Sequence, residues 1–215
     1  FDTVATRSAD PFYISKETAE KLTEVHKYWQ GRTTSELATS YMAPETLAAI
    51  EHNIFTVGNY FYNGIGHVNV DYAKVLKIGF KGIYEYAKSE RDKCCICDSD
   101  YTKRYYFLTS VMESCESAII FAKRYAKEAK KMADECTDIK RREELLTVAE
   151  ICSKVPENGA TSFHEACQSF WFIQLLIQTE SSGHSISPGR FDQYMYPYYI
   201  KDIESGKITL DGKIV

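Results

Sequence analysis

The sequence predicts a predominantly α-helical fold, and three observations support this prediction. Several long stretches repeat apolar residues at steps of three and four, the period of a helix that buries one face. Residues 163–179 form an almost wholly apolar segment, which is typical of a helix buried on all sides. Glycines mixed with β-branched and aromatic residues, the pattern of extended chain and turns, are concentrated in residues 55–72.

The N-terminal region is expected to hold two helices. The first begins at Ser15 and ends at Gly31, and the second runs from Pro44, a favourable first-turn residue, to Glu51. On the first helix we expect His26 to be a packed side chain rather than a ligand, because it lies on the apolar stripe. That stripe consists of Ala19, Leu22, Val25, His26 and Trp29.

Residues 55–72 are expected to form a short extended segment with glycine-rich turns. The glycine spacing does not match the dinucleotide or P-loop fingerprints, so the segment is not expected to bind phosphate. Asn59 and His67 are set among these glycines. The pattern alone leaves open whether the two residues shape the turns or belong to a site.

Three helices are expected next, at residues 72–88, from Asp98 or Ser99 to about Cys136, and at residues 139–155. Asp71 is the predicted cap of the first, and Pro156 ends the third. The long middle helix should pair with the third as an antiparallel hairpin. The inward residues are expected to be Val75, Leu76, Gly79 and Ile83, then Leu108, Val111, Cys115, Ala118, Ala122, Tyr125, Ala129 and Met132, and finally Leu145, Leu146, Ala149 and Cys152.

The apolar helix that follows is predicted to begin with a capping box of Ser162 and Glu165. His164 falls in its first turn, where a structural role is the default. A helix that is apolar all round requires burial all round. Such burial is easier to provide in a larger enzyme than in a helical domain of 215 residues.

Charge and composition exclude several classes of protein. A net charge of −4 and a pI near 5.8 give no basis for binding nucleic acid or an anionic membrane. No apolar run is long enough for a transmembrane span, and the first residues do not resemble a signal peptide. The chain starts without Met and stops abruptly, so we expect a single partial domain over residues 1–215, a fragment of a larger protein.

The seven cysteines suggest a reducing cytoplasm rather than a disulfide framework, because they are scattered and odd in number. Those within helical patterns are expected to behave as small buried hydrophobic residues. The cluster Cys94, Cys95 and Cys97 is the one candidate metal site, but it lacks the second ligand pair of a zinc motif. We therefore expect loop thiols and no metal.

The polar turn after the apolar helix completes the candidate site, which consists of Asn59, His67, His184 and Ser185. These neutral donors and acceptors suit the binding and protonation of hydroxyl groups. Ser181, Ser182 and Ser187 are expected to shape the turn. Arg190 and Asp192 are expected to brace it through a charge pair or a helix cap.

At these residues the chain resembles a known family. The segments GHVNVDY, ESAIIFAKRYA, SFHEACQSFWF and ESSGHSISPGRFDQYMYPYY are similar to those of the glycyl radical enzymes. Within this pyruvate formate-lyase-like group they are most similar to the coenzyme-B12-independent glycerol and propanediol dehydratases. The resemblance implies that this piece is the N-terminal part of a ten-stranded α/β barrel wrapped in helices.

The resemblance also implies roles for the four site residues. They match an Asn and a His of the first glycine-rich segment, and a His-Ser pair of the later turn, that line the substrate pocket of diol dehydratases. By this match His67 would give a proton to the leaving hydroxyl and His184 would assist, while Asn59 and Ser185 would hold the hydroxyls. The neutral set favours a small polyol such as glycerol or 1,2-propanediol.

Two motifs of the family are absent from the chain. No cysteine is followed two residues later by Glu, as the thiyl cysteine would be, and there is no Arg-Val-x-Gly-Tyr motif for the glycyl radical. The chain alone is therefore expected to be inactive. The full-length enzyme would be a cytoplasmic homodimer whose glycyl radical is installed by a radical SAM activating enzyme.

Three alternatives remain open from the sequence. The piece could belong to a glycyl radical C–N lyase of the choline type or to an amino-acid dehydratase of the hydroxyproline type. It could also be a non-catalytic helical binding protein that keeps the pattern without the chemistry.

Overall fold

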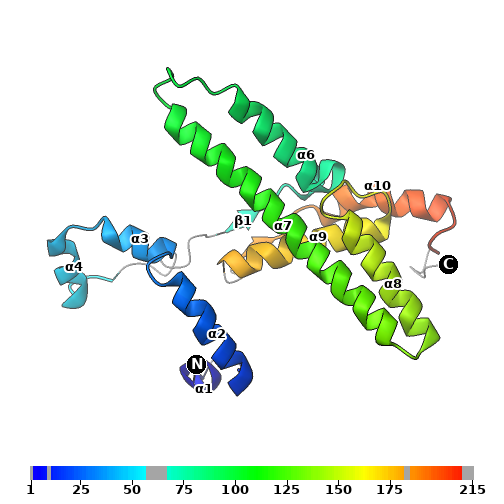
Figure 1. The fold of residues 1–215 in the computed structure, drawn as a ribbon, viewed down its shortest axis with the longest axis horizontal. Helices are drawn as coiled ribbons and strands as arrows, with labels where there is room; N and C mark the ends of the chain where they lie inside the picture. Colours follow the sequence, from blue (N-terminus) through cyan, green and yellow to red (C-terminus); the bar gives the residue numbers. More distant parts are fainter. Residues whose placement is uncertain (1, 9–10, 57–66, 182–184, 210–215) are drawn as a thin grey trace. The chain divides into compact units, whose positions relative to one another are not determined.

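The computed structural model describes residues 2–8, 11–56, 67–181 and 185–209. It divides into two compact units, Phe1–Gly66 and His67–Val215. Nearly all of the elements in the described residues are helices, which confirms the predominantly helical fold (Figure 1). The single partial domain over residues 1–215 stays a prediction.

The first unit contains four described helices, of which two match the prediction. The prediction gave α2 and α4, and Ser15 caps α2 by accepting a hydrogen bond from the Thr18 amide at 3.1 Å. The prediction missed α1 and α3, and α3 begins with a capping box of Thr33 and Glu36. The bounds are α1 (Asp2–Thr6), α2 (Lys16–Trp29), α3 (Thr34–Ser40) and α4 (Pro44–Glu51).

The apolar stripe of α2 is not a buried face, so this part of the prediction was wrong. No residue of α2 is buried, and the side chains of Val25 and Trp29 are about half exposed, at 50% and 49%. His26 is exposed rather than packed. Helical periodicity shows which face of a helix is apolar, but it does not show whether another element covers that face.

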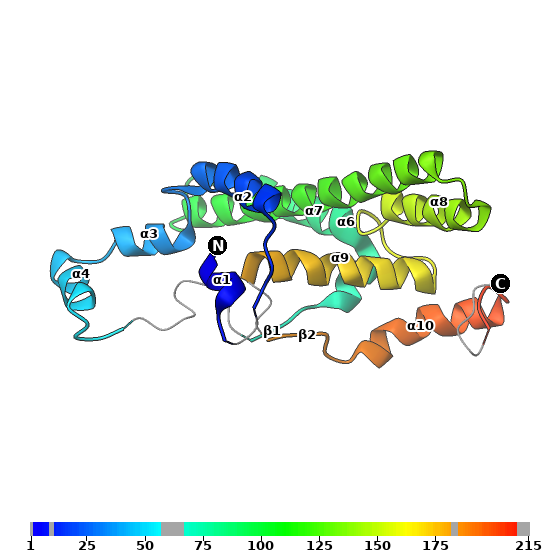
Figure 2. The same cartoon turned by 90° about the horizontal axis from the view of Figure 1, so that it is seen from below.

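The second unit is built on one long helix, α7 (Tyr101–Glu135). Helix α6 (Tyr72–Asp92) packs along α7, and α8 (Ile139–Lys154) returns antiparallel to it (Figure 1). The predicted helical hairpin is therefore confirmed. Helices α9 (Phe163–Ser181) and α10 (Phe191–Glu204) lie on one face of the layer formed by α6, α7 and α8, and α9 contacts α6, α8 and α10 (Figure 2).

The inward face of α7 drifts away from the predicted stripe towards its C-terminal end. Tyr125 and Met132 are 48% and 46% exposed, whereas Met112 and Ala133 are buried. On α8 the prediction was wrong for Leu146, which is 40% exposed. A straight helix has 3.6 residues per turn, so a stripe extended by strict steps of three and four leaves the buried face over a long helix. The residues of the two stripes that are buried as predicted are Cys115, Ala118, Ala122, Ala129, Leu145 and Cys152.

Helix α9 is held at its N-terminus by two buried carboxylates. Glu165 is 6% exposed and accepts hydrogen bonds from the amide and hydroxyl of Thr161, both at 2.7 Å. Ser162 accepts from the Glu165 amide at 3.2 Å, so half of the predicted capping box is present. Asp202 of α10 accepts from the Phe163 amide at 2.7 Å, which binds the end of α10 to the start of α9.

Burial of α9 is incomplete within this chain, which agrees with the expectation that full burial requires a larger enzyme. Ala166, Phe172 and Ile173 are buried, but the side chain of Trp171 is 54% exposed. The buried Phe172 packs on α7 and α8 through Phe121, Ala122 and Cys152.

Helix α6 is interrupted at Gly79, whose φ of 67° is the left-handed conformation that glycine adopts without strain. The Phe80 and Lys81 amides turn away from their own helix and donate to the carbonyls of Pro156 and Glu157, at 2.8 and 2.9 Å. The Leu76 carbonyl in turn accepts from the Ala160 amide at 2.8 Å. The segment after α8 thus replaces the hydrogen bonds that the break removes.

We predict that Gly79→Ala lowers the free energy of unfolding by about 3 kcal/mol or more. A Cβ at this position would lie 2.2 Å from the Glu157 carbonyl oxygen and 2.5 Å from the Asn158 backbone, so two main chains would have to separate. Gly206→Ala is the matched control, because Gly206 has a similar φ of +71° but no atom within 4 Å of the added carbon. The control should cost only the backbone strain, about 1–2 kcal/mol. Chemical denaturation of both variants checks this, and equal losses would contradict it.

We predict that stability falls on acidification partly through Glu165. Burial alone would raise the pKa of this carboxyl, but the Thr161 hydrogen bonds and the Lys154 ammonium at 3.7 Å outweigh burial and hold the pKa below its usual value. The ionised form therefore stabilises the fold above pH 4.5, and this contribution is lost as the pH falls through the lowered pKa. Glu165→Gln should reduce the unfolding free energy at pH 7 by about 1–3 kcal/mol and should flatten its decline in acid. Denaturation at a series of pH values measures both effects, and an unchanged slope would refute the assignment.

Candidate active site

A two-stranded parallel sheet joins the segment before α6 to the segment between α9 and α10. The strands are β1 (Val68–Asn69) and β2 (Ile186–Ser187), with Val68 opposite Ile186 and Asn69 opposite Ser187. The Val68 amide donates to the Ser185 carbonyl at 3.2 Å. The sheet thus pairs, in a defined register, two segments that are more than 100 residues apart in the sequence. Strand β2 also contacts α9.

The sheet has one polar face and one apolar face. Val68 and Ile186 are half-buried, whereas the residues that alternate with them are exposed, as the period of two in a strand requires. An open hollow of about 370 Å³ lies at this sheet. Its lining residues are His67, Val68, Asn69, Ser185, Ile186 and Ser187.

Two of the four predicted site residues are brought together here. His67 directly precedes β1, Ser185 directly precedes β2, and both line the hollow. Ser185 has a φ of 54°, a left-handed conformation that is uncommon for a residue other than glycine and that often occurs at functional sites. Asn59 and His184 lie outside the described residues.

Two further polar residues of the hollow, Asn69 and Ser187, were missed as site residues. The pairing of β1 with β2 places Asn69 opposite Ser187, and both line the hollow together with His67 and Ser185. Ser187 was predicted to be a turn former, and this is confirmed, because its hydroxyl accepts from the Gly189 amide at 3.2 Å. The same side chain also lines the hollow.

Tyr194 supports the turn that follows β2. Its hydroxyl donates to the Pro188 carbonyl at 2.7 Å, and its ring stacks on Tyr72 with 5.7 Å between ring centres. Burial, together with the neighbouring Tyr72, raises the pKa of Tyr194 to about 12, so the donor proton is kept at any physiological pH. The Tyr72 ring also packs on Phe170 of α9, and its hydroxyl donates to Gln174.

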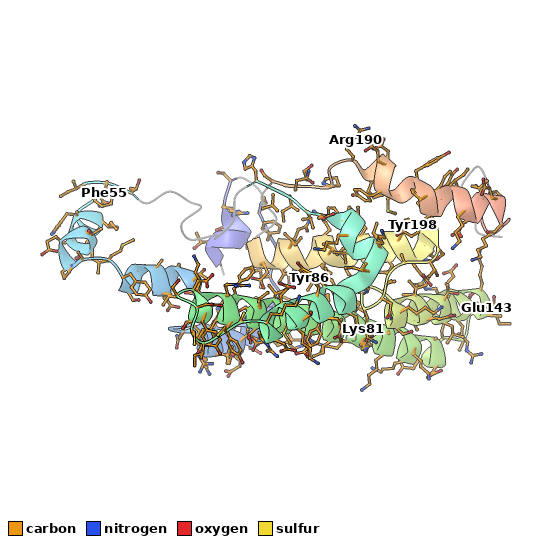
Figure 3. All side chains as sticks on the ribbon, turned by 90° about the horizontal axis from the view of Figure 1, so that it is seen from above. Phe55, Lys81, Tyr86, Glu143, Arg190 and Tyr198 are labelled. Atoms are coloured by element: carbon orange, nitrogen blue, oxygen red, sulfur yellow. The ribbon has the colours of Figure 1, made fainter. Side chains whose placement is uncertain are left out.

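The predicted charge pair of Arg190 and Asp192 is confirmed. The guanidinium donates to both carboxylate oxygens of Asp192 at 3.4 Å, which holds the pKa of Asp192 below its usual value. Figure 3 shows Arg190 directed outward at the start of α10. Both side chains are 71% exposed, so the pair braces the surface of the turn rather than the hollow.

The described residues contain no cluster of three His, Cys, Asp or Glu side chains that could hold a metal ion. Cys95 and Cys97 are exposed, and Cys94 is half-buried. Cys115 and Cys152 are buried as predicted, and burial raises the pKa of Cys152 to about 11, which makes that thiol unreactive. No helix in the described parts of the chain has both the length and the apolar character of a membrane span.

Comparison with known proteins identifies the family. A family model described as pyruvate formate lyase-like matches residues 1–213, which is nearly the whole chain. The chain belongs to the pyruvate formate lyase-like family. The resemblance to glycyl radical enzymes is thereby confirmed, as is a fold that matches the N-terminal part of such an enzyme.

Relatives of this pyruvate formate lyase-like chain include several dehydratases. A solved structure on 1,2-propanediol dehydration in Roseburia inulinivorans is 60% identical, with a TM-score of 0.81, over 98% of this chain and 25% of that one. The glycerol-bound B12-independent glycerol dehydratase of Clostridium butyricum is 57% identical, with a TM-score of 0.76, over 93% of this chain and 25% of that one. The (2S)-3-sulfopropanediol dehydratase of Klebsiella oxytoca is 34% identical over 94% of this chain and 25% of its own length. The chain thus spans about a quarter of these relatives.

We predict that Tyr194→Phe loosens the β1–β2 pairing without unfolding the unit. The Val68 amide should exchange with solvent about 3- to 10-fold faster, because the turn after β2 loses one hydrogen bond. Tyr198→Phe is the matched control, since Tyr198 lies one turn further along α10 (Figure 3) and donates to the Leu76 carbonyl at 3.1 Å, away from the strands. Hydrogen-exchange mass spectrometry or NMR makes the comparison. Equal acceleration in both variants would argue against a specific role for Tyr194.

Proposed function

We propose that this chain is the N-terminal portion of a glycyl radical dehydratase that eliminates water from a small diol or polyol of the glycerol or 1,2-propanediol type. The observation that supports this most directly is the pairing of β1 with β2, which brings His67 and Ser185 to one hollow. The family and the two dehydratase structures described above agree with the chemistry of that hollow. The isolated chain is not expected to be active.

The composition of the hollow favours a neutral substrate. Its polar lining residues are an imidazole, a carboxamide and two hydroxyls, and the described lining includes neither a carboxylate nor a Lys or Arg. Such groups bind hydroxyls through hydrogen bonds in both directions. A cationic substrate would find no partner of opposite sign among them, and an anionic one would find only the imidazole in its protonated form.

The radical chemistry would come from parts of such an enzyme that this chain lacks. In such an enzyme the glycyl radical and a cysteine would supply the removal of a hydrogen atom from the carbon that bears one hydroxyl of the substrate. The open side of the hollow is compatible with groups from elsewhere, because His67, Asn69, Ser185 and Ser187 are all exposed in this chain.

The residues of this chain would then handle the loss of water. His67, protonated, would give its proton to the neighbouring hydroxyl, which leaves as water, and the proton that the remaining hydroxyl releases as its carbon becomes a carbonyl would restore the one that His67 gave. The number of protons given to the substrate thus equals the number that the substrate releases. The carbon that lost its hydroxyl would then take back the hydrogen atom removed at the start. Ser185 and Asn59 would hold the hydroxyls, and His184 would assist with the proton. Donors fixed on a sheet before the reaction stabilise the charge that develops on the leaving oxygen.

The same proposal covers the whole protein's partners. We expect a cytoplasmic homodimer with a small-molecule polyol substrate, activated by a radical SAM enzyme, with no role for nucleic acid or membranes. A C–N lyase of the choline type or a hydroxyproline-type dehydratase is the runner-up, and turnover of an amine or amino acid but no polyol would select it. A non-catalytic binding protein would require that no cysteine and glycine radical motifs follow this chain.

We predict that His67→Ala abolishes dehydration in the activated full-length protein while leaving radical formation intact. Loss of a general acid typically lowers the rate by about 10²- to 10⁴-fold. Electron paramagnetic resonance measures the radical, and product analysis with glycerol and 1,2-propanediol measures dehydration.

His52→Ala is the control for this substitution, because His52 is an exposed residue at the end of α4. It should leave both the radical and turnover unchanged. Normal turnover in the His67→Ala variant would refute the proton-donor role. Failure of the unmodified enzyme to act on any polyol would refute the substrate class.

A further inference from the structure

The side chain of Asn69 in the hollow packs against the protein without a hydrogen bond to any described residue. Asn69 is exposed on the hollow, opposite Ser187 and two residues after His67. Among the described residues none hydrogen-bonds its carboxamide, which therefore offers two N–H donors and one acceptor to the hollow. Because Asn69 is exposed, these groups are accessible to a molecule that enters the hollow.

Gly189 lies directly against this carboxamide. A Cβ on Gly189 would lie 2.7 Å from Oδ1, 3.1 Å from Nδ2 and 3.3 Å from Cγ of Asn69. The side chain of Asn69 thus occupies the space that the missing side chain of Gly189 leaves. The φ of +65° at Gly189 adds a second reason for glycine at this position.

The turn that contains Gly189 is itself held. The Gly189 amide donates to Ser187, and the neighbouring Pro188 carbonyl accepts from Tyr194. On the other side, β1 is followed closely by α6, and the Tyr72 amide donates a hydrogen bond to the Val70 carbonyl at 2.9 Å in the short connection. Asn69 and Gly189 therefore meet between two supported segments, and the carboxamide is preorganised towards the hollow.

We propose that Asn69 is a further substrate-binding residue, packed against Gly189, and that it contacts a third polar group of the substrate. This inference rests on the proposed function. Residues two apart on one strand are separated by about 6.6 Å, so Asn69 reaches a different part of the substrate from His67. A triol has a hydroxyl to offer there, whereas 1,2-propanediol has a methyl group.

The first test compares substrates in the activated full-length protein. Asn69→Ala should raise the KM for glycerol about 3- to 10-fold, the value of one lost hydrogen bond, with little change in kcat. The KM for 1,2-propanediol should change less than twofold. Equal losses on both substrates, no loss on either, or a wild-type enzyme that dehydrates only the diol would overturn the inference.

The second test examines the contact with Gly189 without any substrate. Gly189→Ala should lower the melting temperature more than Gly206→Ala, because both carry positive-φ strain but only the first meets another side chain. In an Asn69→Ala background this difference should disappear. If it persists, Asn69 does not pack against Gly189, and that half of the inference fails.

The two tests separate this inference from the proposed function. An enzyme that turns over neither glycerol nor 1,2-propanediol would overturn the proposed function, and substrate binding by Asn69 with it. Turnover of both substrates with no selective effect of Asn69→Ala would overturn only the inference.

Discussion

The second unit depends on the exchange of backbone hydrogen bonds at the break in α6. Around Gly79 the helix loses hydrogen bonds of its own backbone. Carbonyls of residues 156–157 accept hydrogen bonds from the Phe80 and Lys81 amides instead, and the Leu76 carbonyl accepts one from the amide of residue 160. Because buried backbone groups must be paired, neither segment can leave without exposing the other. The break therefore fixes α6, the end of α8 and the start of α9 relative to one another.

A few side-chain contacts connect α6 to the turn beside the hollow. Tyr72, at the start of α6, is 1% exposed and packs between Phe170 of α9 and Tyr194 of α10. Tyr194 then holds the turn after β2 through Pro188. Rigid helices thus determine the position of two loops, which is the usual way in which a site is built on a scaffold.

The hollow combines predicted and unpredicted features. His67 and Ser185 were found from the sequence because a His and a Ser among glycine-rich turns suit hydroxyl chemistry, and because the surrounding strings match a family. Asn69 and Ser187 were not, because a two-residue strand is too short for alternation to stand out. Only the register of β1 against β2 shows that Asn69 and Ser187 lie opposite each other at the hollow that His67 and Ser185 also line.

The sequence by itself determined the family and six of the described helices, and it did not show α1, α3 and α10. Apolar periodicity, the caps at Ser15 and Asp71 and the stop at Pro156 are local signals, and the structure has each of them. Only the tertiary structure decided which apolar faces are covered, as the exposed Trp29, Tyr125 and Trp171 show. It also decided that α6 breaks at Gly79 and that β1 meets β2. The physical reason is that a helix depends on residues within one or two turns, whereas burial and strand pairing depend on segments far apart in the chain.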